Sequence, residues 1–169
     1  MFQIGETVLY ELWGVCTIEC METQKSTEGV QEYLVLRPVY HDTAKLYLPN
    51  KQACLEKVLR YVLDRDQIRE LLQDLTKEPL QWVEDPKERS RQFRQILSEG
   101  DRGQLLRLIR LLYLRRKELR EKGRNLRMTD DQALRDAEKL LNGEFAYVLG
   151  IPLQEVPNYI HAYMDALEE

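Results

Sequence analysis

The chain has 169 residues, of which 43% are hydrophobic and 32% are charged, enough for one ordinary domain or two small ones. It holds no run of about 18 apolar residues, and its N-terminus has neither a basic region nor an apolar stretch, so we expect neither a membrane span nor a secretory signal. Three cysteines form no dense framework, which predicts free thiols in a reducing cytoplasm.

The net charge of −4 conceals a strong asymmetry along the chain. Residues 1–55 and 56–86 each carry −3, residues 87–127 carry 14 Lys/Arg and 5 Asp/Glu for +9, and residues 128–169 carry −7. A basic segment between acidic neighbours indicates an anionic partner such as nucleic acid. The alternative is a solvated helix face whose arginines pair with the acidic C-terminal helices.

Residues 2–49 are typical of β structure. Short β-favouring segments at 7–10, 15–21, 32–37 and 45–48 are separated by turn residues or end at proline. Four short strands in about 50 residues predict a small antiparallel sheet or SH3-like barrel. Such a sheet normally leaves an edge strand available for a partner.

The second of these segments shows a regular alternation. Cys16, Ile18 and Cys20 are expected on one face, with Thr17 and Glu19 on the other, which predicts a half-buried strand. Cys16 and Cys20 resemble a metal-binding pair only superficially, because both would face the core and no second ligand pair has zinc-site spacing.

From residue 53 onward the apolar period is helical, and the helix ends carry capping signals. Asp85-Pro86 with a glutamate at the third helical position is a strong start, and glycines mark several ends. The predicted helices run from Asp64 to about 75, from Asp85 to near Gly100, from Asp101 to about Lys122, from a capping box at Thr129 over roughly 130–149, and from the Pro152–Pro157 segment to Leu167. The predicted fold class is therefore α+β, with a β-domain over residues 1–55 and an all-α helical bundle over residues 56–169.

The long predicted helix has two contrasting faces. Five leucine and isoleucine side chains between residues 105 and 119 share one face at 100° per residue, while Arg107, Arg110 and Lys117 lie on the opposite side. The pattern predicts a buried leucine stripe and an exposed basic stripe.

Catalytic motifs are not found in the sequence. The two histidines, His41 and His161, have no matched nucleophile or acid nearby in a known motif, and there is no Walker A sequence, no G-x-G-x-x-G and no nucleophile elbow. We therefore expect a protein that is not an enzyme, with no cofactor, metal, membrane or small-molecule substrate.

Two features suit a nucleic-acid partner. One is Trp82, which lies in an extended segment before the basic helices and could wedge against a base step; the alternative is a core aromatic that pins its loop onto the bundle. The other is a run of cations that could pair with phosphates: Arg89, Arg91, Arg94, Arg102, Arg107, Arg110, Arg115, Arg116, Lys117, Arg120, Lys122, Arg124 and Arg127.

In combination, these segments resemble the CarD family of bacterial transcription regulators, over about residues 1–149. The likeness is distributed over the β-segments, the loop tryptophan and the helices that follow. The segments that carry it are residues 2–10, 32–36, 46–49, 82, 97–101, 112–116 and 136–144.

The resemblance implies a Tudor-like N-terminal domain, of the type that forms the polymerase-interacting module of the transcription-repair coupling factor. By this likeness the domain docks on the RNA polymerase β subunit, adding its edge strand to a polymerase strand. The family's polymerase-contacting basic positions correspond to Gln24 and Tyr47, with lysines beside both. The residues expected to bind polymerase are Gln24, Lys25, Arg37, Lys45 and Tyr47.

The resemblance also implies that the helical domain binds promoter DNA at the upstream edge of the melted region. There the tryptophan would enter the widened minor groove and stabilise the open complex. The residues expected to bind DNA are Trp82, Arg89, Arg91, Arg94, Arg107, Arg110 and Lys117.

One alternative remains within the same fold: an adaptor that binds polymerase or another regulator without touching DNA. It is motivated by the acidic C-terminal segment and by residues 83–86, which separate Trp82 from Lys87 and Arg89 and include two acids.

Overall fold

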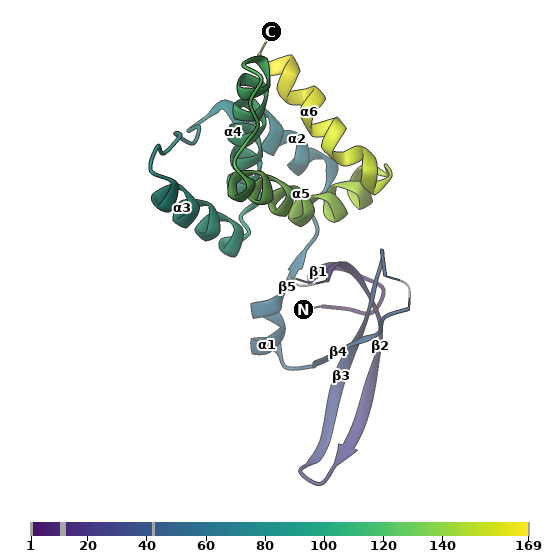
Figure 1. Cartoon of the computed structure of the whole chain (residues 1–169). Helices are drawn as coiled ribbons and strands as arrows, with labels where there is room; N and C mark the ends of the chain where they lie inside the picture. The colour runs from purple at the N-terminus through teal and green to yellow at the C-terminus, as the bar shows by residue number, and fades with distance from the viewer. Residues whose placement is uncertain (1, 11–12, 42, 169) are drawn as a thin grey trace. The chain divides into compact units, whose positions relative to one another are not determined.

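The computed structural model of the chain describes residues 2–10, 13–41 and 43–168 (Figure 1). The chain divides into two compact units, Met1–Leu63 and Asp64–Glu169, called here the N-terminal unit and the helical unit. An antiparallel sheet in the first and helices in the second confirm the predicted α+β class.

The N-terminal unit is built on a five-stranded antiparallel sheet with the strand order β4-β3-β2-β1-β5. Its β2–β3 hairpin extends well past the other strands (Figure 1). The elements are β1 (Thr7–Tyr10), β2 (Gly14–Ser26), β3 (Gly29–Pro38), β4 (Leu46–Pro49), α1 (Gln52–Val58) and β5 (Leu59–Tyr61).

A single apolar cluster fills the space between the sheet and α1. Alternation on the strands and Leu55 of α1 supply it, because successive strand residues point to opposite faces. Its buried members are Val8, Cys16, Ile18, Leu34, Leu36, Leu55 and Leu59.

A β-bulge corrects the predicted position of Cys20. Ile18 pairs with Leu36, but the register shifts, so that Cys20 pairs with Val35. An extra residue in one strand reverses the alternation beyond it. Cys20 therefore lies on the face opposite Cys16 and Ile18, and the prediction that all three share one face was wrong.

The fifth strand was also missed by the sequence prediction. Residues 59–61 follow α1 directly and pair with β1, in the register Val8–Tyr61 to Tyr10–Leu59. A three-residue strand inside a stretch of helical periodicity has almost no local signal, and its partner lies about 50 residues away in the sequence.

The helical unit contains five α-helices among its described residues. All five begin or end close to the predicted positions. The elements are α2 (Arg65–Gln73), the 3-10 turn η1 (Asp74–Thr76), α3 (Pro86–Glu99), α4 (Arg102–Glu121), α5 (Met128–Leu149), the 3-10 turn η2 (Leu153–Glu155) and α6 (Val156–Leu167).

Local capping chemistry explains most of these boundaries. The side chains of Asp64, Asp85 and Asp101 each accept a hydrogen bond from the backbone N–H three residues on, which satisfies one of the free donors of a helix start. Gly100 and Gly150 end α3 and α5 in the left-handed conformation, with φ of 66° and 69°.

The start of α5 differs from the prediction. The helix begins at Met128, its N-cap residue Arg127 makes no side-chain capping bond, and the capping box expected at Thr129 is therefore wrong. Asp130, which belonged to that motif, is instead buried and holds Arg89. Asp130 thus forms an ion pair with a residue that is distant in sequence, and it does not take part in capping the start of α5.

Helix α4 lies at the centre of the helical unit, in contact with α2, α3 and α5. Its leucine stripe is buried as predicted, and the bulky core side chains around it come from all the other helices. Fully buried members include Leu72, Leu105, Leu108, Ile109, Leu112, Phe145 and Ile160. Across the described ranges, every helix is too short or too polar to cross a membrane.

Candidate binding surfaces

Three of the predicted polymerase-binding residues share the face of the sheet that turns away from the apolar cluster, called here the outer face. Tyr47 of β4 is opposite Val35 of β3, and Val35 alternates with the core residue Leu36. Arg37 is two residues from Val35 and Lys45 two residues from Tyr47, so both take the same face. Lys45 and Tyr47 are exposed. The structure thus brings Arg37, Lys45 and Tyr47 together.

Glu19, a residue that the sequence prediction did not select, joins this surface at the bulge. Both of its carboxylate oxygens accept hydrogen bonds from Arg37, from Nε at 3.2 Å and from Nη2 at 3.2 Å. These bonds, together with the charges of Arg37 and Lys45, hold the pKa of Glu19 below its ordinary value. The outer face is therefore a mixed surface in which one carboxylate orders two cations.

Gln24 and Lys25 lie farther out on the β2–β3 hairpin, on opposite faces of it. Gln24 pairs with Gln31, and Lys25 pairs with Val30. Counting from the bulge, Gln24 has the parity of the outer face and Lys25 does not. Only one of these two adjacent residues can therefore contact the same partner surface as Tyr47.

Two sheet edges are open next to the outer face. Strand β4 is an edge strand, and β1 pairs with β2 only over Gly14 to Thr17. Within the described residues, β2 from Glu19 to Ser26 pairs with β3 alone. An exposed edge presents unpaired backbone N–H and C=O groups that a strand of another protein can complete.

Trp82 of the helical unit is held by two arginines. The guanidinium of Arg89 lies 4.4 Å from the centre of its ring and that of Arg115 lies 4.8 Å away, at distances typical of cation–π contacts. The ring is half-buried. The structure is compatible with both interpretations of Trp82. The ring holds its loop against the helices, and part of the ring is still accessible.

Arg89 cannot reach DNA, and its predicted role is wrong. Its side chain is 4% exposed and donates Nε to Oδ1 of Asp130 at 3.0 Å and Nη2 to Oδ2 at 2.9 Å. Its Nη1 also donates to the carbonyls of Val83 at 2.9 Å and Glu84 at 3.2 Å. Arg89 is therefore a buried staple that ties α3, the Trp82 loop and the start of α5 together.

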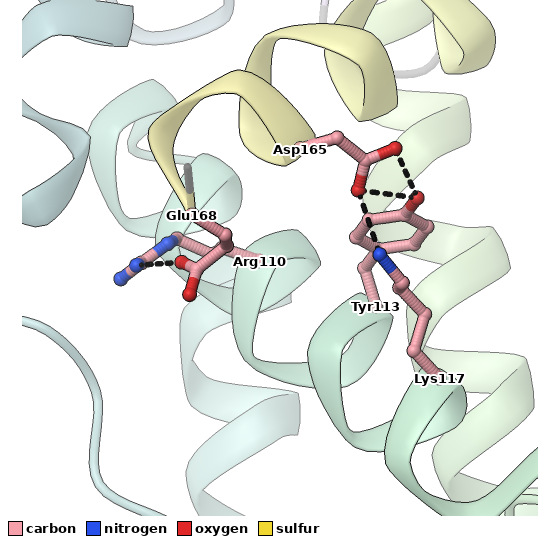
Figure 2. A network of polar contacts seen from close by, with 5 residues as sticks. All are labelled: Arg110, Tyr113, Lys117, Asp165 and Glu168. Carbon is pink, nitrogen blue, oxygen red and sulfur yellow. Dashed lines mark hydrogen bonds and ion pairs between the residues drawn. The ribbon is translucent and has the colours of Figure 1, made fainter. Parts of the chain in front are cut away.

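The predicted basic stripe of α4 is engaged by neighbouring segments of the same unit. Arg107 donates Nε to the carbonyl of Lys77 at 3.0 Å. Arg110 pairs with Glu168 at 2.6 Å and Lys117 with Asp165 at 3.0 Å, as Figure 2 shows. The predicted exposure was wrong for Arg107 and Arg110, which are partly covered by the segment after η1 and by Glu168, whereas Lys117 keeps a side chain that is 47% exposed.

Asp165 is the centre of a polar network between α4 and α6. The hydroxyl of Tyr113 donates to its two oxygens at 3.0 and 3.1 Å. Hydrogen bonds from Lys117 and Tyr113 lower the pKa of Asp165, and the bond to Asp165 raises the pKa of Lys117. The pKa of Tyr113 is raised, chiefly because its hydroxyl is removed from water and secondly because of the hydrogen bond to Asp165 and the negative charge of that residue. The network also includes His161, whose ring stacks on Tyr113 with 4.2 Å between centroids.

A buried carboxylate of the acidic segment 128–169 pairs with one more cation of the basic segment. Arg102 donates Nε and Nη2 to the carboxylate of Glu144 at 2.7 and 2.6 Å, and Glu144 is 1% exposed. Four cations of the basic segment, on α3 and α4, are thus held by carboxylates of α5 and α6. The alternative interpretation of the charge asymmetry, internal pairing, is confirmed for them.

The remaining cations lie on two short stretches. On α3, Arg91 is 70% exposed beside Glu88, and Arg94 is exposed with a weak bond to the carbonyl of Ser90. The second stretch is the end of α4 and the loop to α5. Its exposed members Arg120, Arg124 and Arg127 have no ion pair within the described residues. They belonged to the arginine run but not to the predicted DNA-binding set.

In the part of the chain that the structure describes, no group of three or more His, Cys, Asp or Glu side chains is placed to hold a metal ion. Cys16 and Cys20 occupy opposite faces of β2, and His41 packs edge-on against Trp13.

Comparison with known families identifies the N-terminal unit. Residues 2–62 match the family model described as "CarD-like/TRCF RID domain", in which TRCF is the transcription-repair coupling factor and RID its RNA polymerase-interacting domain. The match spans 61 of the 169 residues and coincides with the sheet unit. The N-terminal unit is therefore an RNA polymerase-interacting domain of the CarD and TRCF type, which links the chain to transcription.

Proposed function

We propose that this protein regulates transcription by docking its N-terminal unit on the β subunit of RNA polymerase, through the outer face and the adjoining sheet edge. One observation carries the proposal: in a domain of the polymerase-interacting type, Tyr47 is exposed on the edge strand β4 and Lys45 is exposed just before that strand, near Arg37. These three residues are separated in sequence, and the sheet places them on one face.

The geometry suits binding by strand addition. Backbone groups of an open edge supply hydrogen bonds that do not depend on the partner's sequence, while alternate side chains supply specificity. Tyr47 brings an aromatic ring of the kind that often dominates interfaces. Arg37 and Lys45 add positive charge to this surface, which suits an acidic partner.

A pull-down with a purified β-subunit lobe tests the docking surface. The double variant Lys45→Glu/Tyr47→Glu changes the charge by −3 at exposed positions and should reduce binding at least tenfold, because alternate residues of β4 carry the contact. The matched control Gln52→Glu/Lys57→Glu makes the same charge change on exposed positions of α1 and should bind like wild type. Equal losses in both variants would refute the assigned surface.

We propose further that the helical unit contacts promoter DNA around Trp82 and stabilises the open complex. Contacts bring this region together, since Arg115 of α4 lies on the Trp82 ring and Asp130 of α5 holds Arg89 of α3. The exposed cations on α3, at the end of α4 and in the loop to α5 would supply the phosphate contacts. These cations are Lys87, Arg91, Arg94, Arg120, Arg124 and Arg127.

A second candidate function is a polymerase-bound adaptor that makes no DNA contact. A specific observation favours it: the four cations Arg89, Arg102, Arg110 and Lys117 are already held by carboxylates of the same chain. This pairing removes a large part of the positive surface that the sequence predicted.

A gel-shift titration across salt distinguishes the two candidates. DNA binding requires an affinity that falls steeply with ionic strength, by a slope of about 0.9 per phosphate contact. Arg124→Gln/Arg127→Gln should flatten that slope by up to about 1.8, whereas Arg69→Gln/Arg135→Gln, at exposed cations elsewhere in the unit, should leave it unchanged. Absence of wild-type binding at low salt would support the adaptor.

The role of Trp82 is tested by open-complex lifetime. Trp82→Ala should shorten the lifetime while polymerase binding stays intact, and Trp82→Phe should retain part of the effect because a planar ring is kept. An unchanged lifetime in Trp82→Ala, measured where wild type lengthens it, would remove the wedge from the proposal.

A further inference from the structure

The last turn of α6 places two carboxylates against two cations of α4. Asp165 lies at the end of α6 and Glu168 is the residue that directly follows the helix; the segment from Asp165 to Glu168 is called here the last turn of α6. Lys117 and Arg110 are seven residues apart on α4. The pairs measure 3.0 Å for Lys117 to Asp165 and 2.6 Å for Arg110 to Glu168. Figure 2 shows both carboxylates directed from α6 toward α4.

These acids are unfavourably located within their own helix. The C-terminal end of a helix carries partial negative charge and favours cations, yet the last turn of α6 has no basic residue. The compensating positive charge comes from α4. The turn is therefore held in place by Arg110, Lys117 and the hydroxyl of Tyr113, and not by favourable interactions within α6.

The rest of α6 is fixed in a different way. Val156, Ile160 and Met164 are all fully buried, so the helix is anchored by apolar contacts that contribute much more than exposed ion pairs. Met164 is the last of these anchors. Asp165 and Glu168 lie beyond it, and their carboxylates are 45% exposed. The last turn can therefore separate from α4 while the helix stays in place.

The groups that hold these carboxylates are also phosphate ligands. A guanidinium and an ammonium form charge-assisted hydrogen bonds with phosphate oxygens as readily as with carboxylates. Arg107 lies one turn before Arg110 on α4 and donates a hydrogen bond to the backbone carbonyl of Lys77. Once the last turn of α6 moves away, α4 would present three cations on one side.

We propose that the last turn of α6 is an internal anion that competes with nucleic-acid phosphates for Arg110 and Lys117, and thereby lowers the affinity of the helical unit for DNA. The choice of DNA as competitor rests on the proposed function, whereas the competition itself rests on the ion pairs. Because coupling between two ligands is reciprocal, a polyanion bound to α4 would loosen the last turn of α6 by the same factor.

The decisive variant neutralises the internal anion without removing side-chain volume. Asp165→Asn/Glu168→Gln still offers an acceptor to Tyr113. Its matched control is Asp66→Asn/Glu70→Gln, which makes the same chemical changes at exposed positions of α2. Thermal unfolding followed by circular dichroism should show both variants folded.

Fluorescence anisotropy with a short labelled duplex, measured over a range of NaCl concentrations, gives the first readout. The α6 variant should bind about fivefold or more tightly than the α2 control, and its salt slope should steepen by up to about 1.8 because two further phosphates are engaged. Equal gains in duplex affinity in the two variants would show that the change in net charge alone causes the effect, which would overturn the inference.

Retention on immobilised heparin, a sulfated polyanion, separates this inference from the proposed function. If no form of the protein binds the duplex, the DNA proposal fails, yet the α6 variant should still elute at higher NaCl than the α2 control. Co-elution of the two variants would overturn the competition whatever happens with DNA.

A variant that lacks both cations tests whether the gain in affinity depends on them. In Arg110→Gln/Lys117→Gln, the α6 substitutions should change neither duplex affinity nor heparin elution, because the contested groups are absent. A gain that persists in this background would contradict the assignment to Arg110 and Lys117.

Discussion

Each unit holds an arginine against a glutamate through two parallel hydrogen bonds, and the two pairs differ chiefly in exposure. In the N-terminal unit the side chains of Arg37 and Glu19 are 42% and 38% exposed. In the helical unit those of Arg102 and Glu144 are 16% and 1% exposed. The same bidentate chemistry therefore orients a cation at an accessible surface in one unit and fixes α4 to α5 in the other.

The comparison extends to the units as wholes. In the sheet, alternation directs Arg37 and Tyr47 to the outer face. Val15 and Val35 of that face are buried, but Lys45 and Tyr47 at its β4 edge remain exposed. A central helix has no face of its own that is certain to remain free, since neighbours can approach from every side. On α4 the polar stripe meets α6 and the segment after η1, and its cations become internal contacts.

The largest expected effect concerns the buried staple of the helical unit. Asp130→Ala leaves the guanidinium of Arg89 buried without its carboxylate and should cost about 3–5 kcal/mol of unfolding free energy. The neighbouring Asp131→Ala breaks an exposed pair with Arg135 and should cost about 1 kcal/mol or less. Urea denaturation of the two variants measures the difference, and similar losses would mean that Arg89 is hydrated in solution.

The two bidentate pairs provide the next largest difference. Glu144→Gln removes the charge from a fully buried carboxylate and should destabilise the helical unit by about 2–3 kcal/mol, less than Asp130→Ala because Arg102 is partly exposed. Glu19→Gln should leave the unfolding midpoint unchanged. If Glu19→Gln proved equally destabilising, the exposed pair would be structural and the contrast between the units would disappear.

The burial of Cys16 can be checked through the thiols of the N-terminal unit. Burial raises the pKa of Cys16 to about 11, so roughly one molecule in a thousand carries the thiolate at pH 8. Cys54 is exposed. Maleimide labelling read by mass spectrometry should therefore modify Cys54 first and Cys16 last, with equal rates in urea. Fast labelling of Cys16 in the folded protein would place it outside the core.

The smallest effect is the acid dependence of the contact between α4 and α6. Because the folded-state pKa of Asp165 is lowered from 3.8, its contact contributes stability above that pH and is lost as pH falls through the lowered pKa. A carboxyl carbon NMR titration should show the depressed pKa, and Lys117→Gln should move it back toward the ordinary range. An unshifted titration in wild type would mean that the network is not formed in solution.

Local chemistry is what the sequence made predictable. Capping aspartates and terminal glycines located α2, α3 and α4 within a residue or two, and the leucine stripe of α4 identified the core of the helical unit. On β4, simple alternation was enough to place Lys45 and Tyr47 outward together.

Interactions between distant segments account for what could not be predicted. The bulge at Glu19 reverses the side of Cys20, although nothing in the local composition marks it. Arg89 and Asp130 are 41 residues apart, and each was assigned a different role from its own surroundings. A helical wheel of α4 shows Arg110 and Lys117 without partners, because it does not include the acidic residues from the end of the chain that pair with them.

The long β2–β3 hairpin has a consequence for how a partner strand would be recognised. Beyond the reach of β1 and β4, both faces of this two-stranded ribbon are largely polar, and Val30 is 66% exposed, so burial does little to specify which residues sit opposite each other. Alignment there depends on the tight turn closed by Ser26 and Gly29 and on the bulge at the other end. A one-residue slip would exchange Gln24 for Lys25 on the side facing the partner. A change in the turn between Ser26 and Gly29 would therefore alter the charge that the hairpin presents on its outer face.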